Sequence, residues 1–284
     1  MTTDSPRRTR PLGVNTYSYS WSAAAGDCVR RLGELGYREF ELLLNPPHLA
    51  LDEFAPDDRR RLAASLAAEG LVVRSLNVPS LDHNLASPMR RMRQYSVGLF
   101  VDAIDLASDL GATYLVVVPG RMSPLFPPPF EARDAWMRES LDALIPHAQK
   151  RGVTLVLENV PFAAFADAAT LGAFVRCYET RSLAVCYDVA NAHFIGESPA
   201  DGLRALRELV RLVHLSDTTR HAWRHDEVGH GDVPFDEVPP ALDEIGFDGT
   251  CMLEIISDEP EGAIQRSRRA LHAFGFTEPF EGGI

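Results

Sequence analysis

The chain of 284 residues is 45% hydrophobic and 24% charged, a composition typical of one soluble globular domain with a full apolar core. Asp and Glu outnumber Lys and Arg by 40 to 28, and the formal net charge of -12 argues against a nucleic-acid partner, because phosphate contacts need clustered cations. No apolar stretch approaches the roughly 18 residues of a membrane span and no signal-peptide core is present, so we expect no membrane association and a cytoplasmic location.

The first half of the chain alternates apolar strands with segments of helical periodicity. Residues 1–10, which include the basic cluster Arg7-Arg8-Thr9-Arg10, are expected to form a disordered tail, and 11–284 a single domain. Strands are predicted at 12–17, 37–44, 71–78 and 114–118, and helices at 27–36, 56–70, 89–111 and 132–151. Before the last helix, the Pro-rich segment 122–130 cannot be helix or central strand. It is either a lid over the active site or a rigid surface loop.

Four apolar strands in the second half each end on a side chain that can bind a metal. The strand 155–157 leads to Glu158, and strands at 183–187, 209–213 and 251–253 lead to Asp188, His214 and Glu254. Helices are predicted at 168–180, 199–207, 235–246 and 262–274. Eight strands alternating with eight helices predict an α/β fold, a single (β/α)8 TIM barrel, in which the carboxyl ends of the strands build the active site.

The four strand-end residues have the chemistry of a divalent-metal site. Carboxylate oxygens with one imidazole suit Mn²⁺, Mg²⁺, Co²⁺ or Zn²⁺, and the absence of thiolates among them disfavours a structural zinc. The alternative is that each residue hydrogen-bonds its own loop. Their equivalent positions on consecutive strands favour one shared site instead.

Five short motifs carry a family resemblance that covers nearly the whole chain, from Gly13 onward. They are Leu157-Glu158-Asn159, Tyr187-Asp188-Val189-Ala190-Asn191, Val213-His214-Leu215-Ser216-Asp217, Gly229-His230-Gly231-Asp232-Val233 and Leu253-Glu254-Ile255. The chain resembles the xylose-isomerase-like TIM-barrel superfamily, which holds sugar phosphate isomerases and epimerases, ketose 3-epimerases and family 2 apurinic endonucleases. The resemblance implies that Glu158, Asp188, His214 and Glu254 bind one metal ion, with Mn²⁺ expected first.

The resemblance also implies that Glu158 and Glu254 face opposite sides of a substrate carbon and exchange its proton. General chemistry supports this role, because a metal that polarises the carbonyl of an α-hydroxy ketone acidifies the adjacent C–H and stabilises the enediolate. A carboxylate on each face then removes the proton on one side and returns it on the other.

Four further residues are expected to contact substrate. Arg220, six residues after His214, falls where the epimerases carry an Arg that contacts a substrate oxygen; its alternative is a surface position. Glu41 matches the Glu of a Gly-x-x-x-x-Glu-Leu pattern and either binds substrate hydroxyls or braces the barrel mouth. Asn191 stands where ketose epimerases usually have His, and Asn can hydrogen-bond a hydroxyl but cannot shuttle a proton. His193 either replaces that role or is a loop histidine.

The endonuclease pattern is incomplete in this chain. Its two additional metal-binding His positions are Val78 and Val118, and valine cannot bind a metal, so a three-metal phosphodiesterase site is not expected. A His-rich loop is expected after the seventh strand, and its His221, His225 and His230 either contact substrate or are solvated. Trp21 and Phe126 are aromatic candidates for covering a sugar-like ligand, with core packing as the alternative.

These observations predict a divalent-metal-dependent isomerase or epimerase that acts on a small, sugar-like molecule by proton transfer. The main alternative is a lyase that uses the same site to expel a leaving group from an enolate, either a dehydratase or a C-glycoside-cleaving enzyme. A non-catalytic binding barrel and an apurinic endonuclease are further alternatives. The substrate and the oligomeric state stay open, although barrels of this kind often form homo-oligomers.

Overall fold

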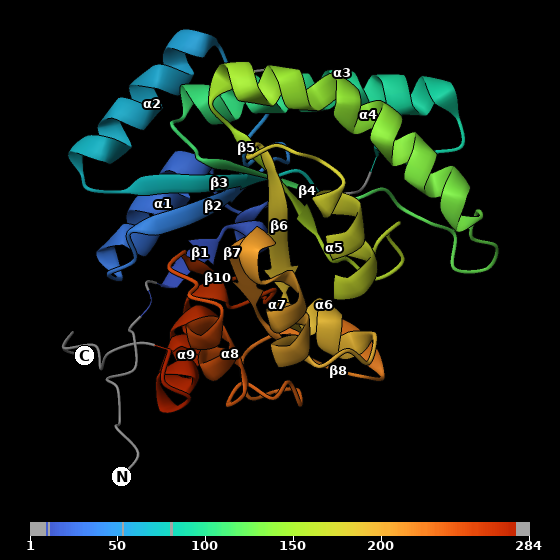
Figure 1. Cartoon of the computed structure of the whole chain (residues 1–284). Coiled ribbons are helices and arrows are strands. Elements are labelled where there is room, and N and C mark those ends of the chain that lie inside the picture. Colours follow the sequence, from blue (N-terminus) through green and yellow to red (C-terminus); the bar gives the residue numbers. More distant parts are fainter. Residues whose placement is uncertain (1–9, 11, 53, 80–81, 277–284) are drawn as a thin grey trace.

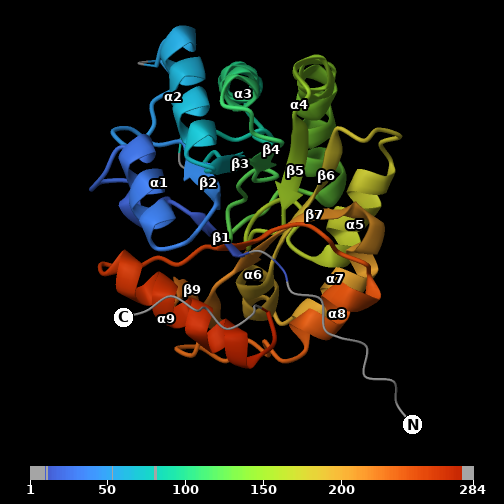
Figure 2. The same ribbon diagram turned by 90° about the vertical axis from the view of Figure 1, so that its left-hand side faces the viewer.

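The strands form a closed parallel barrel, as the computed structural model of the chain shows for residues 10, 12–52, 54–79 and 82–276 (Figure 1). The order around the barrel is β1-β10-β7-β6-β5-β4-β3-β2, and helices surround it on the outside (Figure 2). The predicted (β/α)8 barrel is therefore confirmed. The barrel strands are β1 (Leu12–Asn15), β2 (Glu39–Leu43), β3 (Val72–Asn77), β4 (Tyr114–Val117), β5 (Thr154–Glu158), β6 (Leu183–Asp188), β7 (Val210–Leu215) and β10 (Cys251–Leu253).

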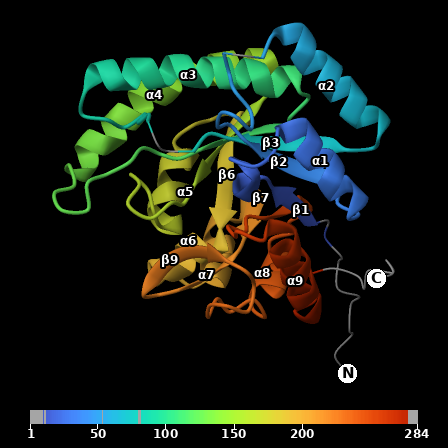
Figure 3. The ribbon, with the colours of Figure 1, turned by 180° about the vertical axis from the view of Figure 1, so that it is seen from behind.

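Amphipathic helices pack their apolar sides on the outer face of these strands. The longest two, α3 and α4, run side by side along one flank of the barrel (Figure 3). Within the described ranges, no helix is both long enough and apolar enough to cross a membrane. The helices are α1 (Ala25–Glu34), α2 (Pro56–Ala68), α3 (Arg90–Asp109), α4 (Phe130–Arg151), α5 (Ala168–Arg176), α6 (Val189–Phe194), α7 (Pro199–Leu206), α8 (Val238–Glu244) and α9 (Pro260–Ala273), with short 3-10 turns at Tyr17–Tyr19 and Arg207–Leu209.

The strands are apolar because the barrel buries both of their faces. All six residues of β6 are buried, as expected for a parallel strand with helices outside and side chains inside the barrel. The barrel interior holds a small apolar cluster of its own, made of Val116, Val156, Ala184, Cys186, Leu212 and Met252. This cluster is the apolar floor on which the polar residues at the carboxyl ends rest.

Strand register brings the polar strand ends to one level. Asp188 pairs with His214 across β6 and β7, and Asn15 pairs with Glu41 across β1 and β2. Because the strands are parallel, all these residues come at the same end of the barrel.

Most elements begin or end a few residues from their predicted bounds, and three local features differ further. Helix α5 ends at Arg176 instead of residue 180, because 3-10-type bonds to Phe174 and Val175 tighten its last turn. A short helix, α6, follows β6 without any intervening turn residue. The expected His-rich loop after β7 contains an antiparallel hairpin of β8 (Asp217–Thr219) and β9 (Ala222–Asp226), whose polar strands carry no alternating apolar pattern.

The expected tail at 1–10 lies mostly outside the described residues. Arg10, its last member, is buried and forms an ion pair with Asp243, and its backbone N–H donates to the Phe276 carbonyl at 3.3 Å. Arg10 therefore packs on the barrel, at the interface with the end of α8.

Candidate active site

The four predicted metal ligands meet at the mouth of the barrel. One potential ligand atom from each of Glu158, Asp188, His214 and Glu254 lies within 4.8 Å of the others, and all four side chains are buried. They stand at the ends of β5, β6 and β7 and directly after β10. The strand-end pattern therefore identifies residues that converge in space.

The His214 imidazole occupies the centre of this cluster. Its Nδ1 atom lies 3.2 Å from Glu158 Oε1, 3.1 Å from Glu254 Oε2 and 3.9 Å from Asp188 Oδ2. Its other nitrogen, Nε2, faces Glu41 Oε1 at 3.1 Å, within ion-pair distance but outside hydrogen-bond alignment. The ring thus directs Nδ1 at the three carboxylates and Nε2 at a fourth.

Hydrogen bonds hold both the side chain and the backbone of Asp188 in place. As the N-cap of α6, its Oδ1 accepts a hydrogen bond from the Asn191 backbone N–H at 2.7 Å. The Asn159 side chain accepts from the Asp188 N–H at 2.7 Å and donates to its carbonyl at 2.9 Å. The second carboxylate oxygen, Oδ2, is left free to face the cluster.

Glu41 lies behind His214 and is fully buried. Its oxygens accept hydrogen bonds from Asn15 Nδ2 at 2.7 Å, Ser75 Oγ at 2.6 Å and Asn77 Nδ2 at 3.1 Å. Burial raises the pKa of Glu41, but His214 and these hydrogen bonds outweigh burial, so the pKa is lowered and the side chain stays ionised. Of the two alternatives for Glu41, its contacts favour bracing the barrel mouth.

Burial and crowding of like charges shift the pKa values of the cluster. Burial raises the pKa of Glu158, and Glu254 and Glu41 raise it further against the opposing effect of His214. Burial likewise raises the pKa of Asp188. Burial alone would lower the pKa of His214, but Cys186, Glu41 and Glu254 around the ring outweigh it and raise the pKa. The cluster therefore holds more negative charge than its imidazole can balance.

The residues fit a divalent metal ion. Asp188 Oδ2 and Glu254 Oε2 are buried without a hydrogen-bond partner among the described residues, a costly arrangement unless a cation satisfies them. Carboxylate oxygens and one imidazole nitrogen form a hard donor set suited to Mn²⁺, Mg²⁺, Co²⁺ or Zn²⁺. The buried Glu158, Asp188, His214 and Glu254 cluster is consistent with a divalent-metal site.

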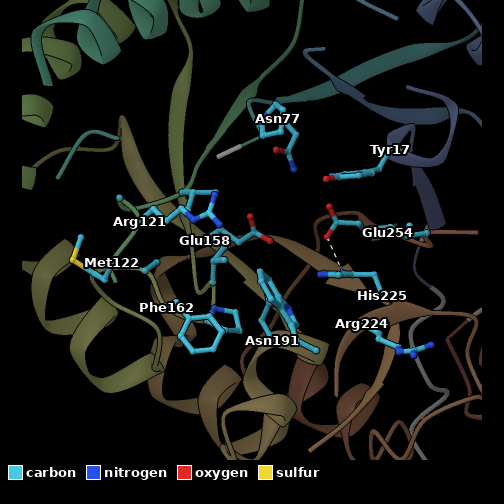
Figure 4. Close-up of a pocket in the computed structure, with 18 of the residues that line it drawn as sticks. Tyr17, Asn77, Arg121, Met122, Glu158, Phe162, Asn191, Arg224, His225 and Glu254 are labelled. Carbon is cyan, nitrogen blue, oxygen red and sulfur yellow. Dashed lines mark hydrogen bonds and ion pairs between the residues drawn. The ribbon is translucent and has the colours of Figure 1, made fainter. Parts of the chain in front are cut away.

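A cavity of about 650 Å³ opens above the cluster (Figure 4). Glu158 and Glu254 line it, with their carboxylates on facing sides, and Tyr17 lies next to Glu254. Burial, Glu254 and Glu158 raise the pKa of Tyr17, so its hydroxyl stays protonated and able to donate a hydrogen bond. Other polar or charged lining residues are Asn77, Arg121, Asn191, Arg224, His225 and Asp226.

The predicted substrate-binding residues divide into two groups. Asn191 lines the cavity, and its Oδ1 accepts a hydrogen bond from Trp223 Nε1 at 2.7 Å, which leaves its amide N–H₂ to donate. His193 and Arg220 do not line it. His193 is buried on α6 and paired with Asp232 Oδ1 at 2.7 Å, whereas Arg220 is exposed at the tip of the β8–β9 hairpin.

The Pro-rich segment 122–130 touches the cavity only at its start. Met122 and Pro124 line the cavity, while Leu125 and Phe126 are 93% and 88% exposed. Trp21, the other aromatic candidate for covering a ligand, is also exposed and outside the lining.

Several cavity residues were not singled out from the sequence. Asn77 stands at the end of β3, so the strand-end rule that predicts the four ligands also applies to it. His225, which the sequence offers only as one histidine of a His-rich loop, lies beside the cluster: its Nδ1 is 3.4 Å from Glu254 Oε2 and 3.7 Å from Asp188 Oδ2. Arg121 and Phe162 are on loops, where no sequence pattern marks a side chain that points into a cavity.

The two positions at which the endonuclease pattern has additional metal-binding histidines hold valines that lie in or near the cavity wall or the core. Val118 lines the cavity and Val78 is buried, so neither can extend the metal cluster. Trp223 stands two residues before His225 and contributes an indole to the lining.

Comparisons with known proteins agree with this architecture. The sequence model of the family described as xylose isomerase-like TIM barrel matches residues 29–274. Fructoselysine 3-epimerase from Escherichia coli O157:H7 is 22% identical over 259 residues, which cover 86% of this chain and 90% of that protein. The crystal structure of a D-tagatose 3-epimerase-like protein has a TM-score of 0.80 at 22% identity, covering 93% of this chain and 96% of that one. At this identity the structural likeness shows a shared fold.

A further curated relative is the uncharacterized protein MJ1311 from Methanocaldococcus jannaschii, which is 28% identical over 192 residues. The match covers 63% of each protein, so this chain spans less than two thirds of that relative's length.

Proposed function

Because the chain belongs to the xylose isomerase-like TIM barrel family, we propose that it is a divalent-metal-dependent isomerase or epimerase that moves a proton on a sugar or sugar derivative through an enediolate. The names of its relatives support a small sugar-like substrate, since they include a fructoselysine 3-epimerase and a D-tagatose 3-epimerase-like protein.

The observation that carries this proposal is the pairing of Glu158 and Glu254 across the cavity. They come from strands on different sides of the barrel, yet Glu158 Oε1 and Glu254 Oε2 lie 3.2 and 3.1 Å from the same His214 Nδ1. Both line the cavity, where Figure 4 draws them on facing sides. A substrate carbon between them would meet one carboxylate on each face, as epimerisation requires.

The chain's residues supply the proton chemistry. When bound, the divalent cation would polarise a substrate carbonyl and stabilise the enediolate. Glu158 removes or returns the proton on one face and Glu254 does so on the other. Burial raises the pKa of Glu158, which makes it a better proton acceptor than an exposed carboxylate.

Neutral donors around the cluster would orient the sugar hydroxyls. The Asn191 amide has one hydrogen-bond acceptor already used by Trp223, so its N–H₂ group is the part that can donate to a substrate oxygen. The Tyr17 hydroxyl is a second donor beside Glu254. Such donors position the substrate without taking part in proton transfer.

Mn²⁺ is the metal we propose for this site, with Mg²⁺, Co²⁺ and Zn²⁺ as the alternatives that the same oxygen-rich donor set accepts. Glu158, Asp188, His214 and Glu254 would hold it, because these are the residues whose ligand atoms converge.

The test is hydrogen exchange on a panel of ketoses and keto sugars in D₂O, followed by proton NMR. The metal-loaded protein should replace the C–H next to the carbonyl by C–D and form the epimer or isomer. Glu254→Gln should lose this exchange, whereas the matched control Glu39→Gln, at the opposite end of β2 from the cluster, should keep it. Exchange that persists in Glu254→Gln contradicts the proposal, and release of an aglycone or water with a new unsaturated carbonyl would identify a lyase.

A further inference from the structure

Aromatic side chains form a wall on one side of the cavity. Phe162 and Trp223 line the cavity with 48% and 43% of their surfaces exposed, and Phe194 packs behind them. The three ring centroids lie 6.2 to 6.4 Å apart. This aromatic wall, defined as Phe162, Phe194 and Trp223, presents apolar surface to solvent at the mouth of a polar site, an arrangement typical of a ligand-binding surface.

Phe162 occupies its place at a conformational cost. Its φ of 62° lies in the left-handed region, which residues with bulky side chains rarely adopt. Cross-loop hydrogen bonds enforce this backbone: Met122 N–H donates to the Phe162 carbonyl at 2.7 Å, and Ala164 N–H donates to the Pro119 carbonyl at 3.0 Å. Glycine would adopt the same φ without strain, so the backbone alone does not explain a phenylalanine here. The position of the Phe162 ring in the cavity lining explains the phenylalanine.

The aromatic wall is joined directly to the polar end of the cavity. Trp223 Nε1 donates to Asn191 Oδ1 at 2.7 Å, and the Asn191 backbone N–H donates to the predicted metal ligand Asp188 at 2.7 Å. The Trp223 ring also lies 6.2 Å from the His225 ring, and His225 lies 3.4 Å from Glu254. A ligand held at the cluster would therefore extend onto the wall.

The cavity is larger than a free monosaccharide requires. At about 30 Å³ for each water-sized group, 650 Å³ accommodates about 20 such groups, whereas a free hexose has about 12 non-hydrogen atoms. The lining beyond the cluster is largely apolar, with Met122, Pro124, Val160 and Ile256 in addition to the wall. Extra volume with apolar lining suits an apolar group attached to the sugar.

We propose that the substrate is a sugar bearing a flat apolar substituent, with its sugar end at the metal cluster and the substituent against Phe162 and Trp223. The orientation of the sugar end rests on the proposed function; the affinity of the wall for an apolar group does not. Figure 4 shows Phe162 and Met122 on one side of the cavity, facing Tyr17 and Glu254 across it.

Calorimetric titration of the Mn²⁺-loaded protein with matched probes tests this inference. The pairs are 1-anilino-1-deoxy-D-fructose against D-fructose, and phenyl against methyl β-D-glucopyranoside. In at least one pair the aryl compound should bind about tenfold or more tightly than its partner, a difference of about 1.4 kcal/mol. Equal affinities in both pairs, or no binding of either aryl probe at about 10 mM, would overturn the inference.

Variants distinguish specific binding of the aryl group to the aromatic wall from nonspecific hydrophobic binding elsewhere on the protein. Phe162→Gly removes the ring at a position whose φ glycine tolerates, so the fold should persist while the aryl preference falls to within about twofold. Phe126→Gly is the matched control, because Phe126 is 88% exposed and does not line the cavity; it should keep the full preference. An aryl preference that survives Phe162→Gly, or that disappears equally in Phe126→Gly, contradicts the wall.

Trp223→Phe tests the link between the two ends. It keeps an aromatic ring but removes the N–H that orients Asn191, so both members of each probe pair should bind more weakly while the aryl preference remains. The outcomes also separate the two proposals. Aryl preference without hydrogen exchange on any keto sugar refutes the proposed function alone, and exchange without aryl preference refutes the substituent alone.

Discussion

Two glutamates of β2, Glu39 and Glu41, show how the two ends of the barrel differ. At the amino end, Glu39 accepts two hydrogen bonds from Arg74, at 2.9 and 2.8 Å, and a third from Thr250. At the carboxyl end, Glu41 joins Glu158, Asp188 and Glu254, and the ion pairs of these four carboxylates with described residues all go to His214 or His225. The amino end is electrically balanced by arginine, and the carboxyl end carries an excess of negative charge.

This difference distinguishes a carboxylate that is balanced within the fold from one that is available to bind a cation. A balanced pair needs no further partner, and removing one member destabilises the fold because the other charge is left uncompensated. A buried excess of carboxylates destabilises the metal-free fold through repulsion, and it is retained where a cation is to be bound. Replacing a glutamate by glutamine should therefore lower the stability of the metal-free fold at the amino end of the barrel and should not lower it at the carboxyl end.

The largest effect is expected from Glu158→Gln and Glu254→Gln. Each should lower kcat by about 100- to 10,000-fold, because the general acid or base of the proposed mechanism is lost. In the presence of a chelator, neither should lower Tm, since each removes one of the crowded charges. Rates of hydrogen exchange and thermal denaturation check both halves of this prediction. A strongly reduced Tm without metal would show that these carboxylates stabilise the fold by themselves.

A smaller effect is expected from Glu41→Gln, which changes the residue behind His214. Glu41 faces His214 Nε2 at 3.1 Å, and its negative charge favours the tautomer with the proton on that nitrogen, which would leave Nδ1 for the proposed metal ion. The loss of this orientation should weaken metal binding by about 10- to 100-fold. Titration of the chelated protein with Co²⁺, followed by its visible absorption, measures the affinity. Ser75→Ala, which removes one neutral hydrogen bond to Glu41, should have a lesser effect; unchanged affinity in Glu41→Gln would mean that Glu41 does not orient the ring.

At the amino end, Glu39→Gln should destabilise the fold by about 1–2 kcal/mol at pH 7 and leave metal affinity unchanged. Burial raises the pKa of Glu39, but the hydrogen bonds from Arg74 and Thr250 outweigh burial and lower it. A lowered folded pKa means that this stability is present above the unfolded value of about 4.3 and is lost as the pH falls through the folded pKa. Urea denaturation at neutral and acidic pH should show the two proteins converging in acid, and a constant difference would contradict the pairing.

The smallest effect is expected from Arg220→Ala. Arg220 is exposed at the hairpin tip and does not line the cavity, so kcat/KM should change by less than about twofold. Arg121→Ala, which changes an arginine of the cavity lining, is the informative comparison and should raise KM. A large loss of kcat in Arg220→Ala would indicate that the hairpin closes over the bound substrate.

The fold and the convergence of Glu158, Asp188, His214 and Glu254 could be predicted from the sequence because both follow from periodic strands. In the sequence, a polar residue follows each of these apolar strands and marks where the strand ends. Parallel strands bring their ends together, as the pairing of Asp188 with His214 shows. The remainder of the site depends on loops. The left-handed Phe162 and the hairpin that carries Trp223 and His225 have no periodic signal. Arg220 is expected to contact substrate only through the family resemblance and its spacing after His214. Cross-loop hydrogen bonds decide these positions, and a sequence does not display them.

Metal content per chain, measured by elemental analysis on protein purified without chelator, tests the central claim most directly. Wild-type protein and Glu39→Gln should each retain about one divalent ion per chain, whereas Asp188→Asn should retain far less. Asn at 188 can still accept the helix-capping hydrogen bond from Asn191, so the fold should persist in that variant. No bound metal in the wild type, even after each ion is added back, or equal metal in Asp188→Asn, would contradict a metal centre at the carboxyl end of the barrel.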